Sequence, residues 1–210
     1  MSEQALRETM VMLGASLFER GYATGGAGNL SARLPDGTLI ATPTGSCLGR
    51  LTPESLSKVS MDGAHLAGDR PSKEVAFHLA LYRNNPQCLA VVHLHCTHLT
   101  ALSCLDGLDP ANVIRPFTPY YVMRVGSLPL IPYYKPGDER IAQELGHRAQ
   151  DAGAFLLANH GPVVMGKNLV EAVNNMEELE ETARLALLLQ GQSIRYLSEP
   201  EVAELRSLKP

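Results

Sequence analysis

Segments with helical periodicity alternate with short strand-like runs along most of this chain, and this alternation limits the possible folds more than any other feature. Apolar residues at helical spacing predict amphipathic helices, and short apolar runs bounded by turn residues predict buried strands. Some of these runs look like hairpin pairs, which are antiparallel. We therefore expect a mixed or antiparallel α/β sandwich and not a purely parallel sheet.

Capping and turn residues predict where these segments begin and end. The expected helices cover residues 1–20, 71–85, 97–105, 138–151 and 168–190, and the expected strands lie within 22–44, 88–95 and 154–166. The expected caps are Ser72, Thr97, Asp138 and Asn168, with Gly21 just after the first helix and a hairpin turn at 35–37. We expect the proline-rich segment 115–139 to wrap the surface near a site, and residues after Ser193 to form an exposed tail.

Length and composition predict one packed domain that spans residues 1–210, with 45% hydrophobic and 19% charged residues. The net charge of -4 provides no general attraction for nucleic acid or anionic lipid, so we expect neither as a partner. The N-terminus lacks the features of a signal peptide, and no apolar run approaches the roughly 18 residues of a spanning helix, which favours a cytoplasmic protein. The 4 cysteines form no CxxC pair and indicate reduced thiols.

Three histidines follow the apolar run in VVHLHCTH. Residues two apart on a strand point to the same face, so His93 and His95 can present two imidazoles side by side. His98 lies at the start of the next helix, where we expect a structural role or a role in supporting the ligands, and not metal ligation. By itself an HxH pair fits a metal site or two ordinary core or surface histidines, because a catalytic metal site needs about three protein ligands.

Two residues elsewhere in the chain could complete such a site. His160 in LLANHGPVV follows another strand-like run, at a place where strand ends often present functional groups. Glu74 lies at the start of its helix, where the helix dipole favours a carboxylate. It could bind a metal, act as an acid or base, or be an ordinary helix-start carboxylate.

Glycine-rich turns and helix starts expose backbone amides that can hold anions. Three such stretches, here called the anion-binding loops, are Gly28-Asn29, Thr44-Gly45 and Ser72-Lys73. Together they suggest a phosphate pocket, although each is weak evidence alone. Neither a Walker loop nor a dinucleotide-type GxGxxG motif is present, which disfavours a nucleotide enzyme.

Five short motifs in order, GNLSAR, TPTG, PSKE, HLH and NHGP, resemble the class II aldolase/adducin family over nearly the whole chain. The resemblance implies a three-layer α/β/α sandwich around a mostly antiparallel central sheet, assembled as a homotetramer with active sites at subunit interfaces. It implies one divalent metal per subunit, most often Zn²⁺, held by His93, His95 and His160. It also implies that Glu74 is the catalytic acid/base and can reach the metal.

The resemblance also assigns roles to other residues. The substrate phosphate is expected at Asn29, Thr44, Gly45, Ser72 and Lys73. Tyr120 or Tyr121 falls where aldolases of the family have a tyrosine proton donor, and we prefer Tyr120. Arg124 could contact a substrate carboxylate or be a solvated arginine.

A more detailed likeness, PSKEVAFHLALYRNNP followed by VVHLHCTH and PYYKPGDE, is similar to the subgroup that decarboxylates 3-oxo-tetronate 4-phosphate in acid-sugar catabolism. This likeness implies a metal-dependent carboxy-lyase that forms dihydroxyacetone phosphate and CO2. The alternatives are a sugar-phosphate aldolase of the fuculose or rhamnulose type and a pentulose-phosphate 4-epimerase. A non-enzymatic, adducin-like scaffold is a third alternative, but it predicts lost ligands, and all four candidate ligands are present.

Overall fold

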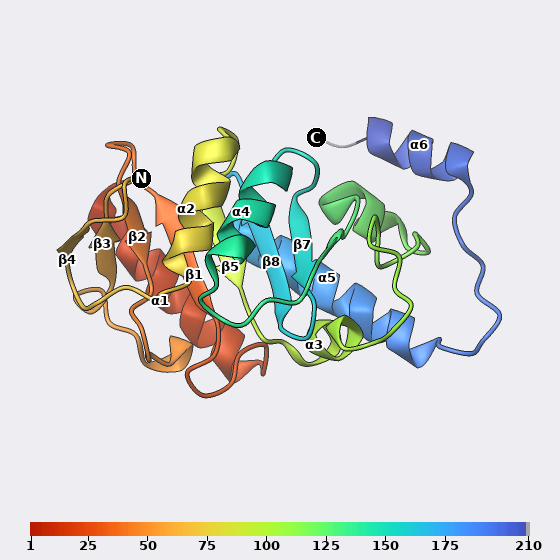
Figure 1. Ribbon diagram of the computed structural model, residues 1–210, viewed down its shortest axis with the longest axis horizontal. Helices are drawn as coiled ribbons and strands as arrows, with labels where there is room; N and C mark the ends of the chain where they lie inside the picture. Colours follow the sequence, from red (N-terminus) through yellow and green to blue (C-terminus); the bar gives the residue numbers. More distant parts are fainter. Residues whose placement is uncertain (209–210) are drawn as a thin grey trace.

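An eight-stranded sheet runs through the middle of the protein in the computed structural model, which describes residues 1–208 (Figure 1). The last two residues of the predicted domain lie outside the described residues. The strand order is β4-β3-β2-β1-β5-β8-β7-β6, and the pairs are antiparallel except β6 with β7. The strands are β1 (Asn29–Arg33), β2 (Leu39–Ala41), β3 (Ser57–Val59), β4 (His65–Ala67), β5 (Ala90–His93), β6 (Leu130–Ile131), β7 (Ala154–Leu157) and β8 (Gly161–Gly166).

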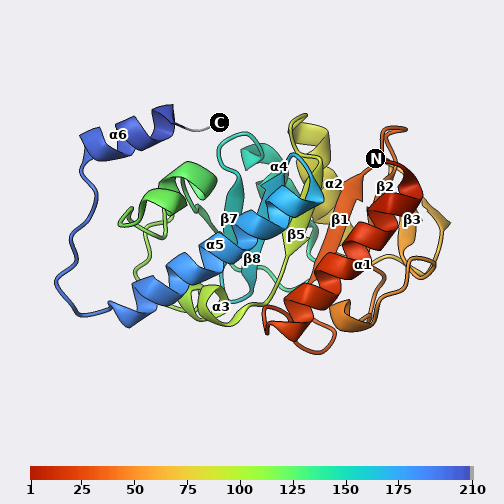
Figure 2. The same ribbon diagram turned by 180° about the vertical axis from the view of Figure 1, so that it is seen from behind.

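Helices cover both faces of this sheet, which confirms the predicted three-layer α/β/α sandwich. Figure 1 shows α2 and α4 over one face, and Figure 2 shows α1 and α5 over the other. The helices are α1 (Glu3–Glu19), α2 (Val75–Asn84), α3 (Thr97–Ser103), α4 (Glu139–Arg148), α5 (Leu169–Leu188) and α6 (Glu199–Ser207), with short turns η1 (Leu48–Arg50) and η2 (Tyr121–Val125). Within residues 1–208, none of them is both long and apolar enough to span a membrane.

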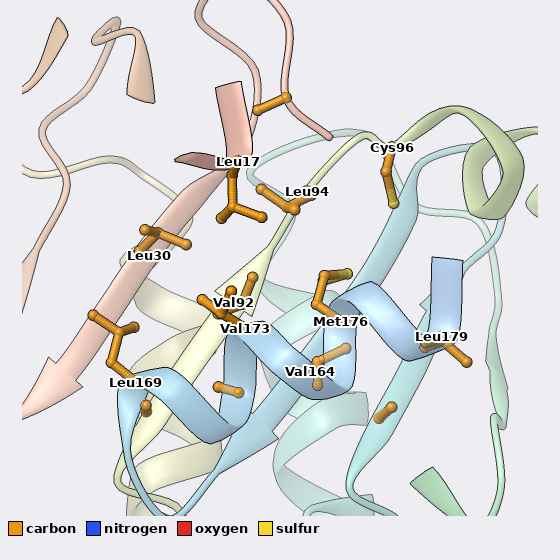
Figure 3. Packing of buried hydrophobic residues seen from close by; sticks show 14 of the residues in the cluster. Leu17, Leu30, Val92, Leu94, Cys96, Val164, Leu169, Val173, Met176 and Leu179 are labelled. Atoms are coloured by element: carbon orange, nitrogen blue, oxygen red, sulfur yellow. The ribbon is translucent and has the colours of Figure 1, made fainter. Parts of the chain in front are cut away.

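Two apolar cores form, one on each face of the sheet, because neighbouring strand residues point in opposite directions. In β5, Val92 packs with the α1 and α5 side, while Val91 packs with the α2 and α4 side. Figure 3 shows Val92 beside Val173 and Met176 of α5. The central strands are therefore buried on both faces, which explains their continuous apolar sequence.

Several predicted helix and turn boundaries are confirmed. The side chain of Asp138 accepts a hydrogen bond from the backbone N–H of Arg140 at 3.0 Å, and Asn168 caps α5 in the same way. Gly21 has φ 78° just past the end of α1, as expected for a glycine that terminates a helix. Gly37, with φ 86°, lies in the hairpin turn between β1 and β2.

Two predicted caps are wrong. Helix α2 begins at Val75, and Ser72 instead accepts a hydrogen bond from the backbone N–H of Glu74 at 3.2 Å. Thr97 is already the first residue of α3. A carboxylate from another element caps that helix, because Glu180 of α5 accepts hydrogen bonds from the backbone N–H groups of the second and third helical residues at 2.8 and 2.9 Å.

The C-terminal segment is more ordered than the predicted tail. After Ser198 the chain forms α6, which starts with a capping box between Ser198 and Glu201. The segment before it is tied to the proline-rich segment, since the Leu197 N–H donates to the carbonyl of Pro116. The proline-rich segment itself contains η2 and the edge strand β6.

Candidate active site

Three histidines from two regions of the sequence meet at one end of the central strands. His93 is the last residue of β5, His95 follows two residues later, and His160 lies in the turn between β7 and β8. Strands β5 and β8 are neighbours, so this turn is close to the end of β5. One ring nitrogen from each histidine lies within 4.8 Å of the others, and the Nε2 atoms of His93 and His95 are 3.1 Å apart. We call these three residues the histidine cluster.

The turn that carries His160 has an unusual backbone. Asn159 has φ 54°, and Gly161 has φ 152°. A Cβ atom at Gly161 would lie 2.5 Å from the carbonyl oxygen of Leu94, so only glycine allows this close approach. The two chain segments that supply the histidine cluster are therefore held in direct backbone contact.

Hydrogen bonding and burial favour the neutral form of the three imidazoles in the histidine cluster. The Nδ1–H of His93 can donate to the carbonyl oxygen of Pro162 at 2.8 Å, which leaves the lone pair on Nε2 directed at the cluster. Burial lowers the pKa of His93 well below its usual value, and burial also lowers the pKa values of His95 and His160. Neutral imidazole nitrogens are the form that binds a divalent metal.

Glu74 faces the histidine cluster from the start of α2. Its two carboxylate oxygens lie 3.6 Å from Nε2 of His93 and 3.5 Å from Nε2 of His160. The side-chain amide of Asn29, from the strand next to β5, donates to the same carboxylate at 2.6 Å. The predicted acid/base residue is thus partly buried and in contact range of two cluster members.

These four side chains fit a divalent cation. Ligands about 2.1 Å from a tetrahedral centre lie about 3.4 Å from one another. The separations of 3.1, 3.5 and 3.6 Å between ligand atoms are close to this value. His95 is exposed, so the cluster is open to solvent and substrate on that side.

The three anion-binding loops are brought together beside Glu74. The backbone N–H of Thr44 donates to the carbonyl of Arg70 at 2.9 Å, and a β-bridge joins Pro43 to Pro71. The second and third loops are therefore adjacent, and the Asn29–Glu74 hydrogen bond ties the first loop to them. The predicted phosphate residues Thr44, Gly45 and Lys73 are exposed, Ser72 is half-buried and Asn29 is buried.

The tyrosine and arginine candidates lie elsewhere within the same chain. Tyr120 and Arg124 are exposed and line a groove of about 940 Å³ together with Cys88, Gly153 and Gly166. These groove residues flank the end of the central strands opposite to His93. Tyr120 and Arg124 therefore do not meet the histidine cluster of their own chain.

Tyr121, the alternative proton donor, is fully buried, and its hydroxyl donates to Oδ1 of Asn112 at 2.8 Å. Burial raises the pKa of Tyr121. Of the two tyrosines, Tyr120 has the available hydroxyl. His98 bonds through Nδ1 to a carboxylate oxygen of Glu180 at 2.8 Å and is not a member of the histidine cluster.

Three residues beneath Glu74 were missed by sequence reasoning: Ser31, His78 and Tyr82. The hydroxyl of Ser31 bonds to Nδ1 of His78 at 2.6 Å and to the hydroxyl of Tyr82 at 2.8 Å, and all three side chains are buried. Burial, together with the nearby His93, lowers the pKa of His78 to about 3. The available signal was the spacing of four between Glu74, His78 and Tyr82, which puts them on one side of a helix. We call Ser31, His78 and Tyr82 the Ser31 network.

Comparison with known proteins agrees with this geometry. Residues 8–187 match the family described as Class II Aldolase and Adducin N-terminal domain. The chain is 69% identical over 205 residues to the 3-oxo-tetronate 4-phosphate decarboxylase of Escherichia coli, covering 98% of this chain and 97% of that protein. It is 61% identical over 207 residues to the enzyme of the same name from Haemophilus influenzae, covering 99% of each.

A solved structure shares both the sequence and the fold. The crystal structure of YgbL from Escherichia coli superimposes with a TM-score of 0.96 at 68% identity, covering 97% of this chain and 99% of that one. The match extends through the segments that carry the histidine cluster, Glu74 and the anion-binding loops. The chain belongs to the class II aldolase and adducin family.

Proposed function

We propose that this protein is a carboxy-lyase that converts 3-oxo-tetronate 4-phosphate to dihydroxyacetone phosphate and CO2. The observation that carries the proposal is the position of Glu74, whose carboxylate faces two members of the histidine cluster and adjoins the anion-binding loops. Relatives that are 61–69% identical over nearly the whole chain bear the name of this decarboxylase, which supports the choice of substrate.

We assign the metal-binding role to His93, His95, His160 and Glu74, and zinc is the metal that this donor set favours. A divalent metal bound there would supply the positive charge that stabilises the electrons left on the substrate when its carbon–carbon bond breaks. The hydrogen bonding of His93 supports the assignment, because the carbonyl of Pro162 can accept a hydrogen bond from Nδ1–H, which leaves the lone pair of Nε2 free to bind a metal.

Glu74 is the proposed proton carrier. In a 3-oxo acid, loss of the carboxylate leaves carbon 2 in need of a proton, and a carboxylic acid beside it can deliver one. The amide of Asn29 holds one oxygen of Glu74 at 2.6 Å, which fixes the direction of the other oxygen. Asn29 therefore orients the acid while Glu74 moves the proton.

The anion-binding loops are the proposed phosphate site. Thr44 and Gly45 come from the second loop and Ser72 and Lys73 from the third, and backbone hydrogen bonding joins these two loops. The hydroxyls of Thr44 and Ser72 and the exposed Lys73 ammonium together offer donors and positive charge for a phosphate. Because these loops adjoin Glu74, a phosphate held there would keep a short sugar acid within reach of the histidine cluster.

A homotetramer with interfacial sites would explain the position of Tyr120. In its own chain Tyr120 lies in a groove at the opposite end of the central strands from the histidine cluster. We propose that the tyrosine, and Arg124 beside it, act in the site of a neighbouring subunit in a cytoplasmic homotetramer. In that position Tyr120 could donate a proton and Arg124 could contact the substrate carboxylate.

Aldol cleavage and 4-epimerisation are the alternatives, because the same kind of site also stabilises the charge formed in those reactions. A scaffold without chemistry is disfavoured by the complete set of His93, His95, His160 and Glu74. Product analysis separates the three reactions. The metal-loaded protein is incubated with 3-oxo-tetronate 4-phosphate and, separately, with ketose phosphates of four to six carbons. We expect CO2 and dihydroxyacetone phosphate from the first. A released aldehyde or an inverted centre from a ketose phosphate, without CO2 from the acid, would reject decarboxylation.

A further inference from the structure

Polar contacts join α2 to β1 in a line that starts at Glu74. Glu74 immediately precedes α2, and His78 and Tyr82 follow it at intervals of four residues, which places all three on the same side of the helix. Asn29 and Ser31 are two apart on β1 and point to the same face of the sheet. Asn29 bonds to Glu74 at 2.6 Å, while Ser31 bonds to His78 at 2.6 Å and to Tyr82 at 2.8 Å. Each polar residue on this side of the helix thus has a partner on the strand.

The spacing along the helix matches the spacing along the strand. Four helical residues rise about 6 Å, and two strand residues rise about 6.8 Å. The step from Glu74 to His78 therefore nearly equals the step from Asn29 to Ser31, so both hydrogen bonds form in one register. A shift of α2 by one residue would turn its side chains by about 100° and break both bonds.

The Ser31 network lies inside an apolar core. Ser31 and His78 are fully buried and Tyr82 is nearly so, among neighbours such as Phe77 and Val91. Apolar contacts by themselves carry little directional information. Buried hydrogen bonds are directional, and an unpaired buried hydroxyl or imidazole is unfavourable. The network therefore selects one placement of α2 that apolar packing alone would not select.

Glu74 depends on this placement. It immediately precedes α2, and its side chain makes no capping hydrogen bond to the helix. Its carboxylate oxygens must stay 3.5 and 3.6 Å from His160 and His93 to serve the same centre. A displacement of about 1 Å at a reacting group can reduce a rate about 100-fold.

We propose that Ser31, His78 and Tyr82 are positioning residues, which fix the register of α2 on β1 and so hold Glu74 at the histidine cluster. All three side chains are buried beneath Glu74. The inference rests on the proposed role of Glu74 as proton carrier. It adds that three buried residues, which lie beneath Glu74, affect the turnover rate.

The test compares Ser31→Ala and Tyr82→Phe with Thr182→Ala in the metal-loaded full-length protein. Thr182 is also buried, and its hydroxyl donates to the carbonyl of Glu178 at 2.8 Å in α5, on the opposite face of the sheet. Assays run well below the unfolding temperature of every variant. We expect kcat to fall about tenfold or more in the two network variants, with KM within about threefold of wild type, and kcat within about twofold in the control.

Three further measurements separate positioning from a general loss of stability. Ser31→Thr keeps the hydroxyl and is expected to recover kcat. The dissociation constant for Zn²⁺, measured by competition with a chelator, is expected to rise in both network variants and not in Thr182→Ala. The pH profile of kcat is expected to shift in Ser31→Ala and to stay unchanged in the control.

Glu74→Gln, measured in parallel, distinguishes the two ways to fail. Near-normal turnover in Glu74→Gln overturns the role of Glu74 and this inference with it. An inactive Glu74→Gln, with kcat and Zn²⁺ affinity in both network variants equal to those of Thr182→Ala, overturns the positioning role alone. If Ser31→Ala does not fold, the result for Tyr82→Phe tests the inference. Tyr82→Phe is expected to fold because it leaves the hydrogen bond between Ser31 and His78 in place.

Discussion

A methyl group added at Gly161 would separate the two segments that carry the histidine cluster. In Gly161→Ala the new Cβ would lie 2.5 Å from the carbonyl oxygen of Leu94 and 3.6 Å from Cα of His95. A carbon and a carbonyl oxygen rest about 3.3 Å apart or more, so the segments must move apart by about 0.8 Å. Ligand distances at a metal site tolerate only about 0.2 Å. The substitution therefore displaces His160 from His93 and His95 by more than a shared ion allows.

We expect Gly161→Ala to bind Zn²⁺ about 10- to 100-fold more weakly than wild type. We also expect its free energy of unfolding to be lower by about 1–3 kcal/mol. Competition with a chromogenic chelator measures the affinity, and denaturant titration of the metal-free protein measures the stability. Gly191→Ala is the matched control, because Gly191 has φ 80° but has nothing within 4 Å of its added Cβ. Equal Zn²⁺ affinity in Gly161→Ala and Gly191→Ala would refute the argument that backbone contact builds the site.

Three further predictions concern single side chains. His93→Ala and His160→Ala are expected to lose the divalent metal that the wild-type protein retains after dialysis, and full retention in both, by elemental analysis, would reject them as ligands. Glu74→Gln is expected to keep the fold and lose turnover, measured as CO2 release; a rate near wild type would remove it as the acid/base. The pKa of His78 is about 3 in the folded protein, well below its value of about 6.5 in the unfolded chain. Between these two pH values only the unfolded state takes up the proton. The free energy of unfolding of the metal-free protein should therefore decrease as the pH falls from about 6.5 toward 3. In denaturant titrations His78→Phe should show a shallower decline over that range, and an identical slope would show that His78 does not contribute.

The layers and the site were predictable from sequence because their signals are local. Apolar runs ended at His93 and His160, and the strands they form turned out to be neighbours in the sheet. The motifs that contain these histidines also indicated the family, and the family predicted the mostly antiparallel sandwich. The caps Asp138 and Asn168 were predictable because each bonds within two or three residues of itself.

The features that sequence missed depend on contacts between distant segments. The cap of α3 comes from Glu180, about eighty positions away, so no local pattern identifies it. The Ser31 network needs the pairing of α2 with β1, which only the assembled sandwich supplies. Helix α6 has no buried residue of its own and a weak apolar pattern, which is why a tail was expected there.

The most direct test of the account is the stoichiometry of products from 3-oxo-tetronate 4-phosphate labelled in its carboxylate carbon. Wild-type protein is stripped of metal, reloaded with Zn²⁺ and compared with Glu74→Gln treated in the same way. The account predicts one labelled CO2 for each dihydroxyacetone phosphate, formed by the reloaded wild-type protein and lost in Glu74→Gln. Dihydroxyacetone phosphate formed without labelled CO2, or equal yields from the two proteins, would contradict it.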